Sequence, residues 1–446
     1  MATNILHRWN TRRARIHRLA KEGGWILVGQ IASVLGALVL VRVLTEYLEP
    51  PEFGELALGL TIATLVNQVV MGGILAGIGR FYSIAVEKGD LGGYLRASRR
   101  LLTYATLVVF LVAIVLISGL VAAGQGQWIG LAVAVLVFSL LFSYNGALNG
   151  VQNAARQRAL VALHSGTDAW LKIGLAVGMM LWLGAASTTV VIGYTLSALV
   201  ITGSQIVFLK RLMRRQSVSH DREGNENWML QVWRFSWPFS VWGVFTWSQQ
   251  VSDRWALEVF ASTQEVGQYA VLFQLGYTPV ILATGLLMTL IGPILYLRSG
   301  AADDHARNTA VHSLAWRVSL ICLTVTGMAF LFARFLHEWI FQWLVAEAFR
   351  DISYYLPWVL LAGGFFATGQ MLSLKMMSEI RTQSLLHLKI GTALIGVGAN
   401  VLGAWWYGVS GVIAALVVFS VVYMLWSAYI AVHLPTSPES LPQQPD

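Results

Sequence analysis

Long apolar stretches separated by short polar segments dominate the chain. A helix needs about 20 mostly apolar residues to cross the hydrocarbon core of a bilayer. Twelve stretches meet that length, at residues 24–46, 56–79, 101–123, 128–150, 159–183, 188–209, 230–257, 268–297, 310–333, 354–376, 384–406 and 409–432. The pattern predicts an all-α polytopic membrane protein with about twelve transmembrane helices.

The composition agrees with a membrane protein. Hydrophobic residues make up 56% of the chain and charged residues 12%, whereas soluble domains carry roughly 25% charged residues. Cys322 is the single cysteine, which excludes an internal disulfide or a cysteine metal cluster. The sequence holds no recognisable nucleotide-binding loop, metal triad or nucleophile–base pair. We therefore expect no catalytic residues, no metal and no bound cofactor, and a protein that is not an enzyme.

The net charge of +8 is explained by orientation in the membrane. Lys and Arg gather before the first span and in every second loop, including the linker from Lys210 to Asn227, while acids dominate the opposite loops. Because positive residues favour cytoplasmic loops, both termini are expected in the cytoplasm, and no nucleic-acid partner is expected. The arm at residues 5–20 fits either a helix on the inner leaflet or an irregular cytoplasmic segment. The proline-containing tail after Leu434 is expected to be disordered.

Two segments of the chain recur in the same order. The repeat predicts two six-helix bundles, residues 1–228 and 229–446, related by a pseudo-two-fold axis along the membrane normal. Such repeats are typical of transporters that work by alternating access. The first pair is Glu52-Phe53-Gly54-Glu55-Leu56-Ala57 with Glu265-Val266-Gly267-Gln268-Tyr269-Ala270, and the second is Arg156, Leu160, Leu163, Gly166 and Thr167 with Arg381, Leu385, Leu388, Gly391 and Thr392.

Five segments carry a resemblance to a known family. They are Glu52-Phe53-Gly54 running on to Gly77–Phe81, Arg156-Gln157-Arg158, Ser252-Asp253-Arg254 followed by Glu265–Tyr269, Trp343–Phe349, and Asn400–Gly403 with Gly408–Val412. In order and spacing the chain resembles the polysaccharide-transport branch, the O-antigen and lipid-linked oligosaccharide flippases, of the multidrug/oligosaccharidyl-lipid/polysaccharide superfamily.

The resemblance implies a flippase of the bacterial inner membrane. It implies that the substrate is a polyprenyl-diphosphate-linked oligosaccharide, moved to the periplasmic leaflet for surface polysaccharide biosynthesis. Membrane lipids, a polysaccharide polymerase and glycosyltransferases are the further partners expected. The resemblance does not decide between lipopolysaccharide O-antigen, capsule and exopolysaccharide, and it does not fix the sugar.

The fifth predicted span contains three polar residues at depth. His164, Asp168 and Lys172 follow one another at intervals of four, so they share one face of a helix. Charges near the bilayer centre cost at least roughly 2.5–3.5 kcal/mol and usually face a cavity or a partner. Two interpretations remain open: a self-neutralising Asp168–Lys172 pair between packed helices, and a cluster in a cavity that binds a headgroup, a proton or a cation.

Three further cations lie toward the predicted cytoplasmic side. Arg317, Lys389 and Arg80, together with Lys172, are our candidates for holding the substrate diphosphate, because Arg and Lys are the natural partners of phosphate groups. The alternative is that these side chains reach toward lipid phosphates.

Two arginines occupy corresponding outer positions in the two halves. Arg42 and Arg254 are candidates for an outer gate, with interfacial anchoring as the alternative. Asp168 and Asp253 are the carboxylates at apparent depth, so they are the candidates for coupling transport to Na⁺ or H⁺.

Other functions fit the pattern less well. A cation-coupled drug or metabolite antiporter of the same superfamily predicts a more apolar cavity with acids, whereas the deep charges here include at least as many bases. A membrane-embedded polysaccharide polymerase or glycosyltransferase would need a larger extramembrane loop than Phe335–Tyr355. A sugar permease of the major facilitator type would carry a basic loop signature that is missing from Arg80–Arg100.

Overall fold

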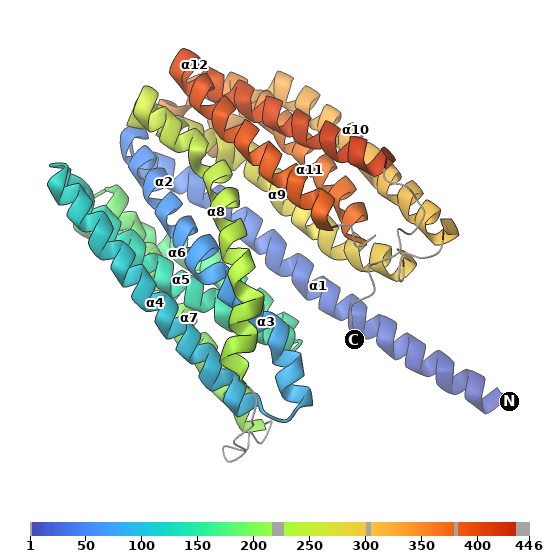
Figure 1. Ribbon diagram of the computed structural model, residues 1–446. Coiled ribbons are helices and arrows are strands. Elements are labelled where there is room, and N and C mark those ends of the chain that lie inside the picture. Colours follow the sequence, from blue (N-terminus) through green and yellow to red (C-terminus); the bar gives the residue numbers. More distant parts are fainter. Residues whose placement is uncertain (1, 216–226, 300–304, 379–381, 434–446) are drawn as a thin grey trace. The chain divides into compact units, whose positions relative to one another are not determined.

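The computed structural model describes residues 2–215, 227–299, 305–378 and 382–433, and these residues are helical almost throughout. The centre of the predicted linker and the predicted disordered tail lie outside the described residues, as do the side chains of the N-terminal arm. The helices, shown in Figure 1, are α1 (Ala2–Tyr47), α2 (Pro50–Leu65), η1 (Val66–Met71), α3 (Gly72–Glu87), α4 (Leu91–Ala122), η2 (Gly126–Trp128), α5 (Ile129–Ala154), α6 (Arg158–Leu183), α7 (Ser187–Arg215), α8 (Trp228–Phe260), α9 (Thr263–Ser299), α10 (His305–Leu344), η3 (Glu347–Tyr355), α11 (Leu356–Ser378) and α12 (Thr382–His433).

The predicted all-α polytopic fold is confirmed. Within the described part of the chain, nine helices are long and apolar enough to cross a membrane. The predicted spans on α6 and α8 are not among those nine, and α12 contains two predicted spans. The exact number of twelve spans stays a prediction.

Gly408 divides α12 at the place where the sequence predicts a boundary between two spans. Its φ of 55° and ψ of −134° lie outside the helical region. A side chain would strain this backbone conformation, and glycine adopts it freely. The Glu265 carboxylate accepts a hydrogen bond from the Val409 amide at 3.2 Å. An acid at the start of a helix satisfies an amide that has no partner within the helix.

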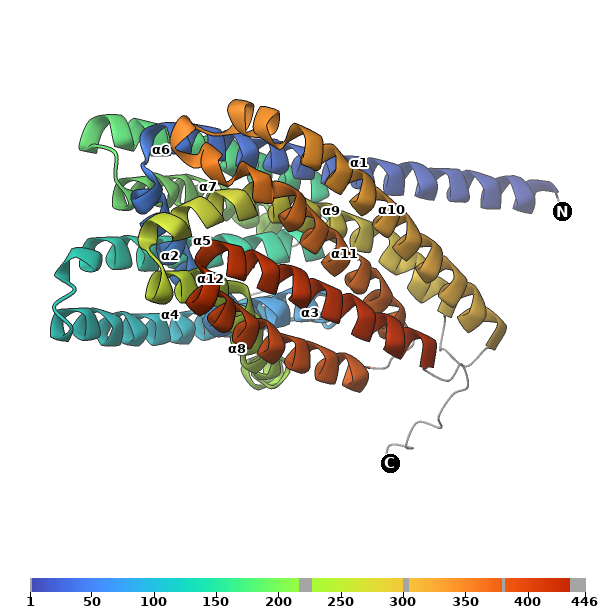
Figure 2. The ribbon, with the colours of Figure 1, turned by 90° about the horizontal axis from the view of Figure 1, so that it is seen from above.

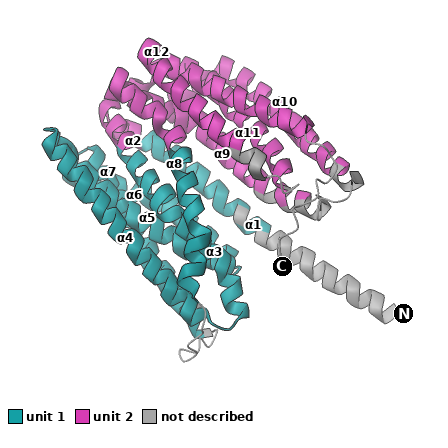
Figure 3. Ribbon diagram, viewed as in Figure 1, with its two compact units in different colours: residues 1–43, 59–247 teal, residues 44–58, 248–446 magenta. Residues whose placement is uncertain are grey.

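The helices form two compact units (Figure 3). Unit 1 comprises residues 1–43 and 59–247, and unit 2 comprises residues 44–58 and 248–446. The units therefore differ from the predicted halves in two segments, 44–58 and 229–247, because packing and not chain order decides which helices belong together. The repeat-based division at residue 228 stays a prediction.

The start of α8 belongs to unit 1 because its first residue is built into that unit's core. The Trp228 side chain is 2% exposed, and its indole Nε1 donates to Asp90 Oδ2 at 2.6 Å. Asp90 also accepts from the Gly93 amide at 2.9 Å and so caps α4. The Trp228 ring makes edge contacts with Phe81 and Tyr94, which hold α8 beside α3 and α4.

Segment 44–58 belongs to unit 2 because the repeated motif packs against its own copy. A Cβ added to Gly54 would lie 2.0 Å from the Thr263 carbonyl oxygen and 3.0 Å from the Gly267 nitrogen. A Cβ added to Gly267 would lie 1.8 Å from the Pro50 carbonyl oxygen and 2.9 Å from the Gly54 nitrogen. The added Cβ of each glycine would thus approach the backbone nitrogen of the other glycine. It would also approach the carbonyl oxygen of the residue four positions before that other glycine. This reciprocity is the pattern of a local two-fold axis between the starts of α2 and α9.

The long helices of unit 2 lie side by side. α11 packs against both α10 and α12, and the two views in Figures 1 and 2 agree on this order. In unit 1, α7 packs against α5 and α6, and α5 also contacts α3. This arrangement places α6, which carries the predicted deep charges, beside α7 and α5.

Candidate substrate cavity

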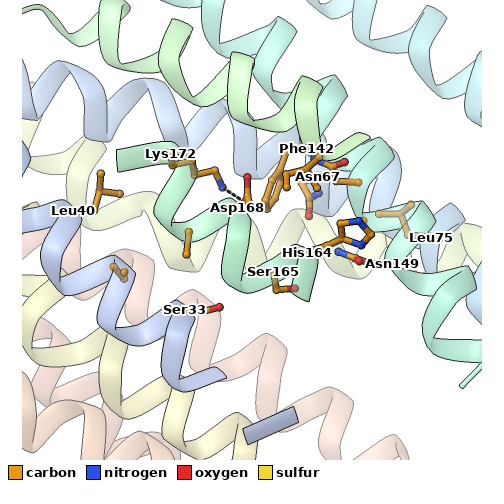
Figure 4. A pocket seen from close by; sticks show the side chains of 16 residues that line it. Ser33, Leu40, Asn67, Leu75, Phe142, Asn149, His164, Ser165, Asp168 and Lys172 are labelled. Atoms are coloured by element: carbon orange, nitrogen blue, oxygen red, sulfur yellow. Dashed lines mark ion pairs between the residues drawn. The ribbon is translucent and has the colours of Figure 1, made fainter. Parts of the chain in front are cut away.

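A cavity of about 450 Å³ lies inside unit 1, lined by residues of α1, η1, α3, α5, α6 and α7 (Figure 4). Small residues allow α1 to approach α6 along one wall. A Cβ added to Gly29 would lie 2.9 Å from the Ala162 Cβ, and one added to Gly36 would lie 2.9 Å from the Ala169 Cβ. Close helix contact through small residues is typical of bundles in lipid. The volume lies within the roughly 300–1,000 Å³ of small-ligand sites.

The predicted charged face of α6 lines this cavity. Lys172 Nζ lies 2.6 Å from Asp168 Oδ2, and the two side chains are 17% and 20% exposed. The other carboxylate oxygen of Asp168 accepts a hydrogen bond from the Ser197 hydroxyl of α7 at 2.9 Å. Lys172 Nζ also lies 5.3 Å from the ring centroid of Phe142, within the range of a cation–π contact. The pair is an ion pair and lines the cavity, and its predicted binding of a headgroup, a proton or a cation stays a prediction.

His164 is the third member of this face and is 3% exposed. One ring nitrogen, Nε2, lies 3.0 Å from the Ser204 hydroxyl of α7. The ring also packs edge-on against Phe208 at a centroid distance of 5.7 Å. His164 therefore adds a polar side chain to the cavity lining, and its contacts with α7 hold the ring in place.

Three asparagines complete the polar lining, and the sequence analysis missed them. Asn67 Nδ2 donates to the Ser143 hydroxyl at 3.3 Å, and Asn149 Oδ1 accepts from Gln205 Nε2 at 2.9 Å. The Asn145 amide accepts from Thr202 at 2.7 Å and donates to the Ala198 carbonyl at 3.2 Å. Amide groups both donate and accept hydrogen bonds, so they match hydroxyl-rich ligands without adding charge.

One signal in the sequence and one in the structure point to these asparagines. Asn145 and Asn149 are spaced by four inside an apolar span, as are the charged residues of α6, so they share one face of α5. Asn67 lies in the π-helix η1, and π-helical turns are frequent at functional sites. The search for deep charges passed over all three because their side chains are neutral.

The other predicted residues of unit 1 do not line this cavity. Arg80 is exposed on α3, and Arg42 is half-buried near the end of the α1 segment that belongs to unit 1. Their predicted roles in diphosphate capture and in an outer gate stay predictions.

Unit 2 holds Asp253 and Arg254 on α8. Asp253 is 4% exposed, and its carboxylate accepts hydrogen bonds from the Tyr269 hydroxyl at 2.8 Å and from the Arg254 amide at 2.7 Å. The Arg254 guanidinium carbon lies 5.0 Å from the ring centroid of Phe273. Asp253 therefore fixes α8 to α9 through Tyr269. Its coupling role and the gate role of Arg254 stay predictions.

The remaining predicted cations of unit 2 lie on separate helices. Arg317 is exposed on α10, and Lys389 is half-buried on α12. A buried cation that the sequence analysis missed is Lys375 of α11, which is 1% exposed and donates to the Ala431 carbonyl at 2.8 Å, in the last turn of α12. A cation at a helix C-terminus stabilises carbonyls that have no amide partner. Over the described residues, no three His, Cys, Asp or Glu side chains gather to hold a metal ion.

Comparison with known proteins reports one family match. The model of the family described as "Polysaccharide biosynthesis protein" matches residues 19–296. No curated protein sequence matches the chain.

Solved structures show the same fold. An inward-closed lipid II flippase MurJ has a TM-score of 0.70 at 12% identity, over 93% of this chain and 88% of its own. An inward-facing multidrug resistance transporter of the MATE family has a TM-score of 0.66 at 15% identity, over 90% and 94%. A transporter of the MOP superfamily from Pyrococcus furiosus has a TM-score of 0.59 at 15% identity, over 94% and 95%. The chain is thus a multi-pass membrane protein with the fold shared by these proteins.

Proposed function

Because the chain belongs to the polysaccharide biosynthesis protein family, we propose that it is a flippase. Its substrate would be a polyprenyl-diphosphate-linked oligosaccharide, carried across the bacterial inner membrane by alternating access for surface polysaccharide synthesis. The termini would lie in the cytoplasm. The likeness in fold to a lipid II flippase supports translocation of a lipid-linked substrate.

The observation that carries this proposal is the chemistry of the unit 1 cavity. Its lining combines three asparagine amides with a histidine, a compensated Asp168–Lys172 pair and the Phe142 ring. A neutral sugar presents many hydroxyls and no net charge. Neutral donors and acceptors that the protein already holds in place match such a ligand.

The residues that line this cavity favour the flippase function over the antiporter function. A cation-coupled drug antiporter needs an acid that is available to a cation. Asp168 is already bound by Lys172 at 2.6 Å and by Ser197 at 2.9 Å, so a cationic drug would have to displace a tethered ammonium group. Removing a partner from such a pair costs about 3–5 kcal/mol. Coupling of flipping to Na⁺ or H⁺ through Asp168 or Asp253 stays a hypothesis.

We assign different parts of the substrate to different residues. The oligosaccharide would contact the unit 1 cavity, where Lys172 holds Asp168 and orients its oxygens. The diphosphate carries about two negative charges and would be held by cations with exposed or half-buried side chains. Of the four predicted cations, Lys172 is paired with Asp168, so Arg80 of unit 1 and Arg317 and Lys389 of unit 2 are each proposed singly as candidates.

Flipping by the purified protein tests the proposal. The protein would be reconstituted in liposomes with a fluorescent polyprenyl-diphosphate oligosaccharide, and exposure of the sugar to an external lectin would be followed over time. We expect the wild type to flip the lipid and Asn145→Ala to slow flipping at least tenfold. Arg234→Gln, which changes an exposed residue of α8 outside the cavity, should flip at the wild-type rate. Equal rates for empty and protein-containing liposomes would refute the proposal.

A further inference from the structure

A second cavity in unit 1 has a different chemistry. Its volume is about 380 Å³, and it lies among α3, α4, α5 and α7. It shares no lining residue with the cavity that holds Asp168 and Lys172. Its walls are mainly aliphatic, with Ile78, Leu95, Leu102, Leu148, Leu209 and Met213 among them. We call it the α4 slot.

The lining of the α4 slot includes one guanidinium group. Arg99 lines the slot, its side chain is exposed, and it lies in the first turns of α4. On α7, the exposed Lys210 and Arg214 each follow directly after a slot residue, Leu209 and Met213. These turns flank loops that the charge pattern assigns to the cytoplasm. With that orientation, Arg99 would lie near the level of the lipid phosphates.

The surface beyond the slot is apolar. Further along α4, Leu107, Leu111 and Ile114 are 58%, 61% and 63% exposed. In a membrane protein such a stripe faces acyl chains. A ligand with a phosphate at Arg99 and an acyl chain in the slot would therefore meet matching chemistry along its whole length.

We propose that the α4 slot binds one anionic phospholipid of the cytoplasmic leaflet. One acyl chain occupies the slot among α4, α5 and α7, and the phosphate is bound by Arg99. Charge complementarity selects an anionic headgroup, since Arg99 lines the slot, the exposed Lys210 and Arg214 adjoin lining residues, and each Lys or Arg near a membrane surface favours anionic lipid. The site is distinct from the oligosaccharide cavity and does not depend on the proposed transport activity.

Lipid retention by the full-length protein tests this site. The protein would be purified in detergent, titrated with phosphatidylglycerol or with phosphatidylcholine of the same acyl chains, and analysed by native mass spectrometry. We expect one phosphatidylglycerol to bind more tightly than phosphatidylcholine. Arg99→Gln should weaken phosphatidylglycerol binding about fivefold, because it removes the cation that lines the slot.

Two further variants make the test specific. Arg100→Gln removes the same charge from the next residue, which is exposed but does not line the slot, and should change affinity less than twofold. Ala147→Leu narrows the slot at a buried lining residue and should weaken both lipids alike. The proposal would be overturned if the wild type bound the two lipids with equal affinity. It would also be overturned if Arg99→Gln and Arg100→Gln lost equal affinity for phosphatidylglycerol. Arg99→Gln changes an exposed side chain, so the test holds even where Ala147→Leu does not fold.

Discussion

Methyl groups added at the crossing of the two repeated motifs should reveal their reciprocal contact. Gly54→Ala would place Cβ 2.0 Å from the Thr263 carbonyl oxygen, and Gly267→Ala would place Cβ 1.8 Å from the Pro50 carbonyl oxygen. Carbon–oxygen contacts in proteins lie at about 3.3 Å or more. Both obstacles are backbone atoms, so a rotamer change cannot relieve either clash.

The geometry sets the size of the effect. The starts of α2 and α9 must separate by roughly 1.3 Å in the first variant and 1.5 Å in the second to reach an ordinary contact. Overpacking of this kind costs about 1–3 kcal/mol. The two changes force apart the same pair of helices, so one separation accommodates both methyl groups. The double variant should therefore cost at least about 1 kcal/mol less than the sum of the single variants.

The free energy of unfolding, measured by denaturant titration in mixed micelles, tests this reasoning. Gly79→Ala is the matched control, because nothing lies within 4 Å of its added Cβ. It should be neutral or should stabilise the protein by up to about 1 kcal/mol, since alanine favours a helix more than glycine does. The reciprocal contact would be refuted if the losses of unfolding free energy in Gly54→Ala and Gly267→Ala were strictly additive. It would also be refuted if either loss were no larger than that of Gly79→Ala.

Three other substitutions test contacts that position the helices. In a double-mutant cycle, Lys172→Met and Asp168→Asn should each lower the free energy of unfolding by about 3 kcal/mol. The double variant should lose less than either single variant, and additive losses would contradict mutual neutralisation. Trp228→Phe removes the indole donor at 2.6 Å from Asp90 and should lower the unfolding free energy by about 2 kcal/mol. Asp90→Asn should also destabilise the protein, because one amide oxygen replaces the two carboxylate oxygens that accept from Trp228 and Gly93. Lys375→Met removes a buried charge and one helix-terminal contact together, so its stability should stay within about 1 kcal/mol of the wild type; a large loss would show a further role.

The sequence predicted the helices well because a backbone in lipid must satisfy its hydrogen bonds internally, so a long apolar stretch indicates a helix. The boundary inside α12 was also predictable, since residues 384–432 are apolar over the length of two spans. The composition of the compact units was not, because side-chain contacts decide it. Trp228 joins Asp90 far back in the chain, and the motif at Gly54 packs on its copy at Gly267. A repeat in the sequence shows the order of the segments along the chain, but it does not show which segments pack against each other.

The candidate site was predictable where charge marks it. The spacing of His164, Asp168 and Lys172 indicated one helix face, and the structure places all three on the cavity wall. The asparagines were missed because neutral amides do not stand out in an apolar span. Arg80 and Arg317 illustrate the opposite problem, since a cation near a span end has the same sequence pattern whether it lines a cavity or reaches toward lipid.

The most direct test of the central claim is the location of the lipid-linked oligosaccharide in cells that lack the protein. A deletion strain would be complemented with the wild type, with Lys172→Ala or with Arg317→Ala. Polyprenyl-diphosphate oligosaccharide would be quantified on each side of the inner membrane, together with surface polysaccharide. The account predicts accumulation on the cytoplasmic side and loss of surface polysaccharide, both rescued by the wild type and by neither Lys172→Ala nor Arg317→Ala. Normal lipid intermediates and normal surface polysaccharide in the deletion strain, with altered sensitivity to toxic cations, would contradict it and favour the antiporter.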